Sequence, residues 1–89
     1  MTKTKSVVKN NKVPIKFEIT NELGVISETG KGWRFEFNRV MWNGEDPKYD
    51  IRRWSPDHEK MGKGVTLTED ELRKLKELID AELVTLDML

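Results

Sequence analysis

The sequence predicts an α+β domain in which an antiparallel sheet of four strands precedes a single C-terminal helix. Apolar and polar residues alternate with a period of two in several short segments, and clusters of turn residues separate these segments. The C-terminal segment instead repeats its apolar residues at helical spacing. Consecutive strands followed by one helix favour an antiparallel sheet that the helix covers on one face, in the order β-β-β-β-α.

A chain of 89 residues is long enough for one small domain. Its first 13 residues hold four lysines and no acidic residue, and they lack a sustained apolar repeat. We therefore predict a flexible basic arm at residues 1–13 and a folded domain at residues 14–89.

The first predicted hairpin joins a strand at residues 15–20 to a returning strand at residues 23–29. Asn21 and Glu22 predict the tight turn between them. The apolar residues that alternate along the first strand, and that are expected to face the helix, are Ile15, Phe17 and Ile19.

Two more strands are predicted at residues 33–43 and 48–54. The first is dense in aromatic and β-branched residues, and the turn cluster that ends it contains Pro47. A polar loop is expected at residues 55–64, and a short apolar segment follows it.

A capping box predicts that the helix begins at about residue 69. The Thr68 hydroxyl can accept a hydrogen bond from the Glu71 amide, while the Glu71 carboxylate can reach back to the Thr68 N–H. So short a chain buries only roughly 60% of its unfolded surface, so oligomerisation would stabilise it. The apolar stripe of the helix is the expected interaction surface: Leu72, Leu75, Ile79, Leu83 and Leu86.

Composition excludes several classes of function. The chain has no cysteine and one histidine, so thiolate and imidazole-rich metal sites are excluded or hard to assemble. No apolar run approaches the roughly 20 residues that span a bilayer. We expect a cytoplasmic protein that has no cofactor, metal, membrane contact or small-molecule substrate.

The net charge of zero conceals an uneven distribution. Residues 1–67 hold 13 basic and 9 acidic side chains, whereas residues 68–89 hold 3 basic and 7 acidic ones. A polyanion responds to the charge of one face rather than to the average. The first part of the chain is therefore where an anionic partner is expected to bind.

If the helix covers one face of the sheet, strand alternation turns two indole rings, Trp42 and Trp54, toward the other face. Arg39 has no clear face, because strict alternation places it with Phe37, and a bulge is suspected there. The cations expected on the open face or in the adjoining loops are Lys16, Lys31, Arg34, Lys48, Arg52, Lys60 and Lys63.

Exposed aromatic rings beside cations are typical of surfaces that bind single-stranded nucleic acid. Bases stack on the rings and cations follow the phosphates, without strong sequence preference. Binding in a duplex groove fits less well, because the helix is acidic on its polar face. The interpretation requires that both indoles be exposed.

The motifs YDIRRW at 49–54 and KMGKGVTL at 60–67, with the leucine-rich terminal helix, resemble the transcriptional coactivator family positive cofactor 4, whose members bind single-stranded DNA. GKGWR at 30–34 and WSPDHEKMGKG at 54–64 resemble its bacterial YdbC-like branch. The resemblance implies a strongly curved sheet and a homodimer formed through the helices. It also implies a base-stacking role for Trp42 and nucleic-acid contacts for Arg52, Lys60 and Lys63, and it places Trp54 within one residue of a second stacking aromatic.

The sequence therefore predicts a non-enzymatic, sequence-tolerant single-stranded DNA-binding homodimer with a role in transcription, replication or repair. RNA is the alternative ligand, and a protein-interaction module that uses the acidic helix is the alternative function. An enzyme would need a carboxylate cluster able to hold a metal. One candidate is Glu45, Asp46 and Asp50, but acids are common in a turn such as the one that holds Glu45 and Asp46. The other is Asp57, His58 and Glu59, which reads more simply as a solvated loop.

Overall fold

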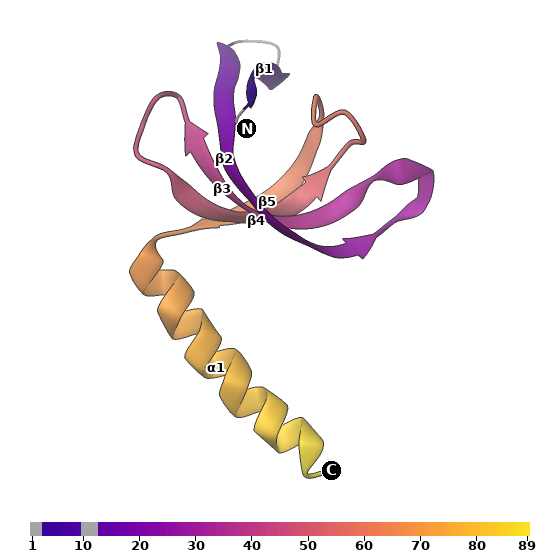
Figure 1. Cartoon of the computed structure of the whole chain (residues 1–89), viewed down its shortest axis with the longest axis vertical. Helices are drawn as coiled ribbons and strands as arrows, with labels where there is room; N and C mark the ends of the chain where they lie inside the picture. The colour runs from indigo at the N-terminus through magenta and orange to yellow at the C-terminus, as the bar shows by residue number, and fades with distance from the viewer. Residues whose placement is uncertain (1–2, 10–12) are drawn as a thin grey trace.

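The computed structural model describes the backbone of residues 3–9 and 13–89, and the side chains from residue 15 onward. The described strands form one antiparallel sheet in chain order, and a helix follows it (Figure 1). The elements are β1 (Lys3–Lys9), β2 (Val13–Glu28), η1 (Gly30–Gly32), β3 (Arg34–Trp42), β4 (Lys48–Trp54), β5 (Met61–Leu67) and α1 (Glu69–Asp87). The predicted antiparallel sheet with a C-terminal helix is confirmed, with β2 to β5 preceding α1.

The predicted first hairpin is wrong, because residues 13–28 form the single strand β2. The turn expected at Asn21 and Glu22 does not form. Instead, β2 shifts register against β3 at three places, each of which adds one residue to β2. Such bulges bend a strand without reversing it, so one long strand replaces two short ones.

The predicted polar loop is shorter than expected, because residues 61–67 form β5 and pair with β4. Gly64 allows this pairing: a Cβ atom there would lie 2.3 Å from Arg52 Cβ. Glycine is depleted in strands in general, which is why the segment resembled a loop.

The predicted arm falls partly outside the described residues, which omit 1–2 and 10–12. Residues 3–9 form the strand β1 and pair with β2. This pairing uses backbone N–H and C=O groups, which a lysine-rich segment carries like any other segment. The flexibility of the arm stays a prediction.

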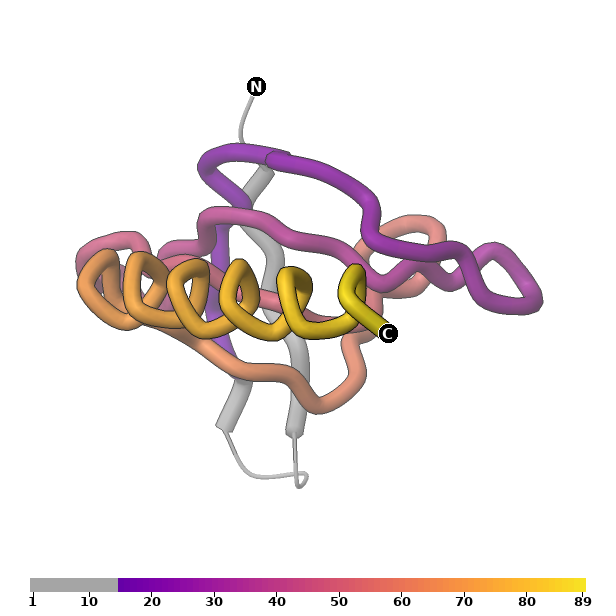
Figure 2. Tube along the Cα trace, turned by 90° about the horizontal axis from the view of Figure 1, so that it is seen from below, coloured from indigo at the N-terminus to yellow at the C-terminus, as the bar shows by residue number. Residues whose placement is uncertain are grey.

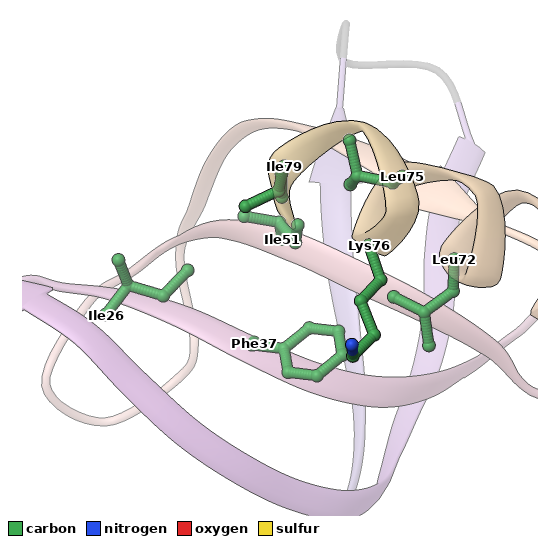
Figure 3. Close-up of a pocket in the computed structure, with 7 residues that line it drawn as sticks. All are labelled: Ile26, Phe37, Ile51, Leu72, Leu75, Lys76 and Ile79. Carbon is green, nitrogen blue, oxygen red and sulfur yellow. The ribbon is translucent and has the colours of Figure 1, made fainter. Parts of the chain in front are cut away.

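The strands curve upward on the side opposite α1, and α1 runs away from the sheet (Figures 1 and 2). We call the face away from α1 the inner face and the face toward it the outer face. Phe37 and Ile51 line a cavity against α1, so they mark the outer face (Figure 3). Strand alternation and register then place these residues on the inner face: Phe17, Ile19, Glu36, Asn38, Val40, Trp42, Asp50, Arg52 and Trp54.

The apolar core lies on the inner face. Phe17, Ile19, Val40 and Trp54 are buried, and Trp42 and Met61 pack against them. Phe17 lies opposite Trp42 in the register, so the prediction that Phe17 and Ile19 face the helix is wrong. The curvature explains the difference, since a strongly bent sheet covers its inner residues with one another and needs no helix on that side.

α1 covers little of the sheet. Its capping box is confirmed: the Thr68 hydroxyl accepts from Glu71 N at 3.2 Å, and Thr68 N donates to Glu71 Oε1 at 2.8 Å. Leu72 and Leu75 are half-buried and line a cavity of about 230 Å³ with Ile26, Phe37 and Ile51 (Figure 3). The rest of the apolar stripe is exposed, including Ile79 (46%), Leu83 (48%) and Leu86 (50%).

Candidate nucleic-acid interface

Trp42 ends β3 on the inner face and is half-buried. The Arg52 guanidinium carbon lies 4.8 Å from its ring centroid, and the Phe17 ring lies 6.0 Å away at an angle of 46°. Its indole Nε1 is buried and has no hydrogen-bond partner among the residues that the structure describes. Packing against the core and the cation–π contact with Arg52 therefore hold this ring, with no hydrogen bond to its Nε1 from the described residues.

Arg52 is 8% exposed, and neighbouring atoms use most of its donors. Its Nε and Nη2 donate to the two carboxylate oxygens of Asp50, each at 2.7 Å. Its Nη1 donates to the Gly62 carbonyl at 3.2 Å. The carboxylate partner compensates the buried charge, and a two-point bond of this kind fixes the plane of a guanidinium.

A second polar cluster surrounds Glu36, which is 3% exposed. Its carboxylate accepts from Asn38 Nδ2 at 2.9 Å and pairs with Arg34 Nε at 3.2 Å. His58 Nε2 lies 3.0 and 3.1 Å from the two carboxylate oxygens. With its proton on Nε2, His58 donates to this carboxylate. The cluster ties the loop after β4 to the inner face.

Trp54 is fully buried, so the prediction that it faces solvent is wrong. Phe17 covers it at a centroid distance of 5.1 Å and His58 at 5.6 Å. The sequence pattern placed Trp54 on the correct face, but it could not show that this face folds over itself. The requirement of two exposed indoles therefore fails, and one partly exposed indole remains.

The predicted cations do not gather on one face. Arg34, Lys48 and Arg52 belong to the inner face with Trp42, since Lys48 lies opposite Val40 in the register. Arg39 belongs to the outer face, where its guanidinium lies 5.8 Å from the Tyr49 ring. β3 keeps strict alternation through Arg39, and the bulges lie in β2 instead.

The remaining predicted cations are exposed. Lys16 neighbours inner-face Phe17 on β2 and so turns to the opposite side. Lys31 lies in the β2–β3 connection with a positive φ of 67°, and Lys60 belongs to the loop before β5. Lys63 lies where β5 shifts register against β4, between Met61 and Gly64, so strand alternation does not assign it to a face.

Sequence reasoning assigned no interface role to Glu36, Asn38, Asp50 or His58. Glu36 with Asn38, and Asp50 with Arg52, are polar pairs two residues apart on a strand, a spacing that puts both side chains on one face. That spacing could have identified the buried clusters. Nothing in the sequence marks the contact of His58 with Glu36, which are 22 residues apart.

Among the described residues, no group of His, Asp and Glu is arranged to hold a metal ion. The described part of the chain also contains no helix long and apolar enough to cross a membrane. The helix surface carries its own ion pairs: Glu69 raises the pKa of Arg73, and Asp80 raises the pKa of Lys76, in each case through a hydrogen bond.

Comparison with known proteins gives two matches. The family model described as Transcriptional Coactivator p15 (PC4) matches residues 29–78. An uncharacterized protein of Treponema pallidum (strain Nichols) is 49% identical over 65 residues, which are 73% of this chain and 76% of that protein. The family match contains β3, β4 and β5, the strands that carry Trp42 and both polar clusters.

Proposed function

Since the chain belongs to the Transcriptional Coactivator p15 (PC4) family, we propose that it binds single-stranded DNA with little sequence preference and acts in transcription, replication or repair. The observation that carries this proposal is the family match over β3, β4 and β5. The family is a nucleic-acid-binding, non-enzymatic one. We also propose that the chain belongs to the bacterial YdbC-like branch of this family, which its motifs resemble.

The inner face supports the proposal through Trp42 and the cations beside it. A partly exposed indole offers a stacking surface to a base, worth about 1–3 kcal/mol. Lys48 is exposed on the same face and is available to a phosphate. The further phosphate contacts that we propose come from Lys16, Lys31, Arg34, Arg39, Lys60 and Lys63. Trp54 has a structural role instead.

We also propose a homodimer formed through α1. Leu83 and Leu86 are half-exposed, and no residue of this helix is buried. An apolar helix face of this extent is typical of an interaction surface. The proposed interface consists of Leu72, Leu75, Ile79, Leu83 and Leu86, and dimerisation would join two inner faces into one protein, which strengthens binding to a long strand.

Binding of an oligo-dT strand and of a matched duplex, each at two salt concentrations, tests the proposal. We expect a mobility shift with the single strand, quenching of tryptophan fluorescence, and weaker binding at higher salt. An equal or stronger preference for the duplex, or no shift at low salt, would contradict it. A matched RNA strand in competition decides between DNA and RNA.

A protein-interaction module is the second candidate, and the exposed helix face favours it. An amphipathic helix can dock its apolar side in the groove of another protein. Sedimentation of the purified chain separates the candidates: a dimer supports the first proposal, whereas a monomer supports a different protein partner.

A further inference from the structure

The surroundings of Arg52 differ from those expected of a residue that contacts phosphate. As a phosphate contact, its guanidinium should be accessible and have most of its donors free. It is instead 8% exposed and holds Asp50 through two hydrogen bonds of 2.7 Å. Asp50 itself is 1% exposed, so the pair is enclosed by the sheet.

The contacts around Arg52 hold its side chain in one orientation. Asp50 is held in turn by the Thr66 hydroxyl, which donates to Oδ2 at 3.2 Å. On β5, Gly62 supplies a carbonyl acceptor at 3.2 Å, and Gly64 lacks the Cβ atom that would collide with Arg52. These contacts come from two strands and leave the guanidinium plane little freedom.

The fixed guanidinium plane lies against Trp42. Its carbon is 4.8 Å from the indole centroid, within the range of a cation–π contact. Because the indole N–H has no partner in the described part of the chain, packing contacts orient this ring, among them those with Arg52 and Phe17. The glycines and the acid of this region therefore act on Trp42 through Arg52.

We infer that Arg52 is a positioning residue, which holds the Trp42 indole in place as the stacking surface and does not offer its charge to phosphate. This inference rests on the proposed function, because it assigns how Trp42 is prepared for a base. It differs from a purely structural role, since loss of the Arg52 geometry should change Trp42 in a protein that remains folded.

The test compares Arg52→Lys with Arg53→Lys. Both changes keep the positive charge, but Arg53 is exposed on the outer face, where it lies over Phe35 at 4.7 Å. In the folded proteins, acrylamide quenching of tryptophan fluorescence is measured with and without Trp42→Phe, which isolates the Trp42 signal. We expect about a two-fold higher quenching constant for Trp42 in Arg52→Lys and no change in Arg53→Lys, because Arg52 makes its cation–π contact with Trp42 and Arg53 makes its contact with Phe35.

Oligo-dT binding across a series of salt concentrations gives the second measurement. We expect Arg52→Lys to lose about ten-fold in affinity, as for the loss of one base stack, and to keep the salt dependence of the parent. Lys48→Ala should instead reduce the slope of log K against log salt by about 1. Asp50→Asn should reproduce the quenching change of Arg52→Lys, although Asp50 contacts no phosphate.

Three results would overturn the inference. The first is an unchanged Trp42 quenching constant in folded Arg52→Lys, and the second is an affinity of Arg52→Lys equal to that of the parent. The third is a slope of log K against log salt that falls by about 1 in Arg52→Ala, as expected for the loss of a phosphate contact. If the parent protein binds no single strand, the proposed function fails, while the quenching comparison still decides whether Arg52 positions Trp42.

Discussion

At the scale of single residues, the inner face combines aromatic rings with charges that compensate one another. Burying an ion stabilises a fold only when its partner and its hydrogen bonds are complete. Asp50 with Arg52, and Glu36 with Arg34 and Asn38, meet that condition. The buried charges therefore define the shape of the face, and the exposed cations are those that remain available to a polyanion.

His58 is predicted to stabilise the inner face from the loop after β4. His58→Ala removes the hydrogen bond to Glu36 and uncovers one side of Trp54. We expect the free energy of unfolding to fall by about 1–3 kcal/mol, because a buried carboxylate loses a donor. Urea unfolding measures this loss, and tryptophan emission should shift to longer wavelength.

Lys60→Ala, in the same loop, is the control for His58→Ala, because the Lys60 side chain is exposed. Its unfolding free energy should stay within about 0.5 kcal/mol of the parent. Equal stability of the two variants would show that the contact between His58 and Glu36 contributes nothing.

Gly64 is predicted to tolerate no side chain. A Cβ atom at this position would lie 2.3 Å from Arg52 Cβ and 2.4 Å from the Ile51 carbonyl oxygen. Gly64→Ala must displace β5, at a cost of about 1–3 kcal/mol. Gly24→Ala is the matched control, since a Cβ atom there meets nothing within 4 Å; thermal unfolding of both variants should separate them, and similar melting temperatures would contradict the prediction.

At the scale of elements, the sequence predicted what local chemistry specifies. The Thr68 capping box, the helical stripe and the segment that became β4 are all encoded by neighbouring residues, and the structure confirms them. β2 and β5 were missed because their form depends on register with a distant strand: three bulges keep β2 continuous, and Gly64 fits only against Arg52. Burial of Trp54 likewise follows from curvature, which no single segment encodes.

The capping box gives a prediction for α1. Thr68→Ala removes the hydroxyl that accepts from Glu71 N, leaving one helix N–H without its partner. We expect a loss of about 0.5–2 kcal/mol in unfolding free energy, measured by urea unfolding followed by circular dichroism. Thr85→Ala is the control: its hydroxyl bonds to the Ala81 carbonyl within the helix and caps nothing, so a loss as large as that of Thr68→Ala would contradict the capping role.

At the scale of the whole molecule, the sheet and the helix differ in how they bury their apolar residues. The curved sheet encloses its own small core of Phe17, Ile19, Val40 and Trp54. The helix leaves most of its apolar stripe exposed to water, and this exposure does not stabilise an isolated chain. A second copy that covers this stripe would bury apolar surface while leaving both inner faces open.

The dimer prediction is tested most directly at Leu83, which lies well beyond the half-buried Leu72 and Leu75 and is 48% exposed. Leu83→Glu should leave the sheet intact and place a charge in the proposed interface, because this half-exposed residue belongs neither to the core cluster nor to the lining of the cavity between the sheet and α1. We expect the parent to sediment as a dimer and Leu83→Glu as a monomer at the same concentration, with about ten-fold or greater loss of affinity for a long single strand as the second site is lost. Glu82→Gln, at the neighbouring helix position outside the stripe, should remain dimeric. A monomeric parent, or a dimeric Leu83→Glu, would show that α1 does not join two copies of this chain.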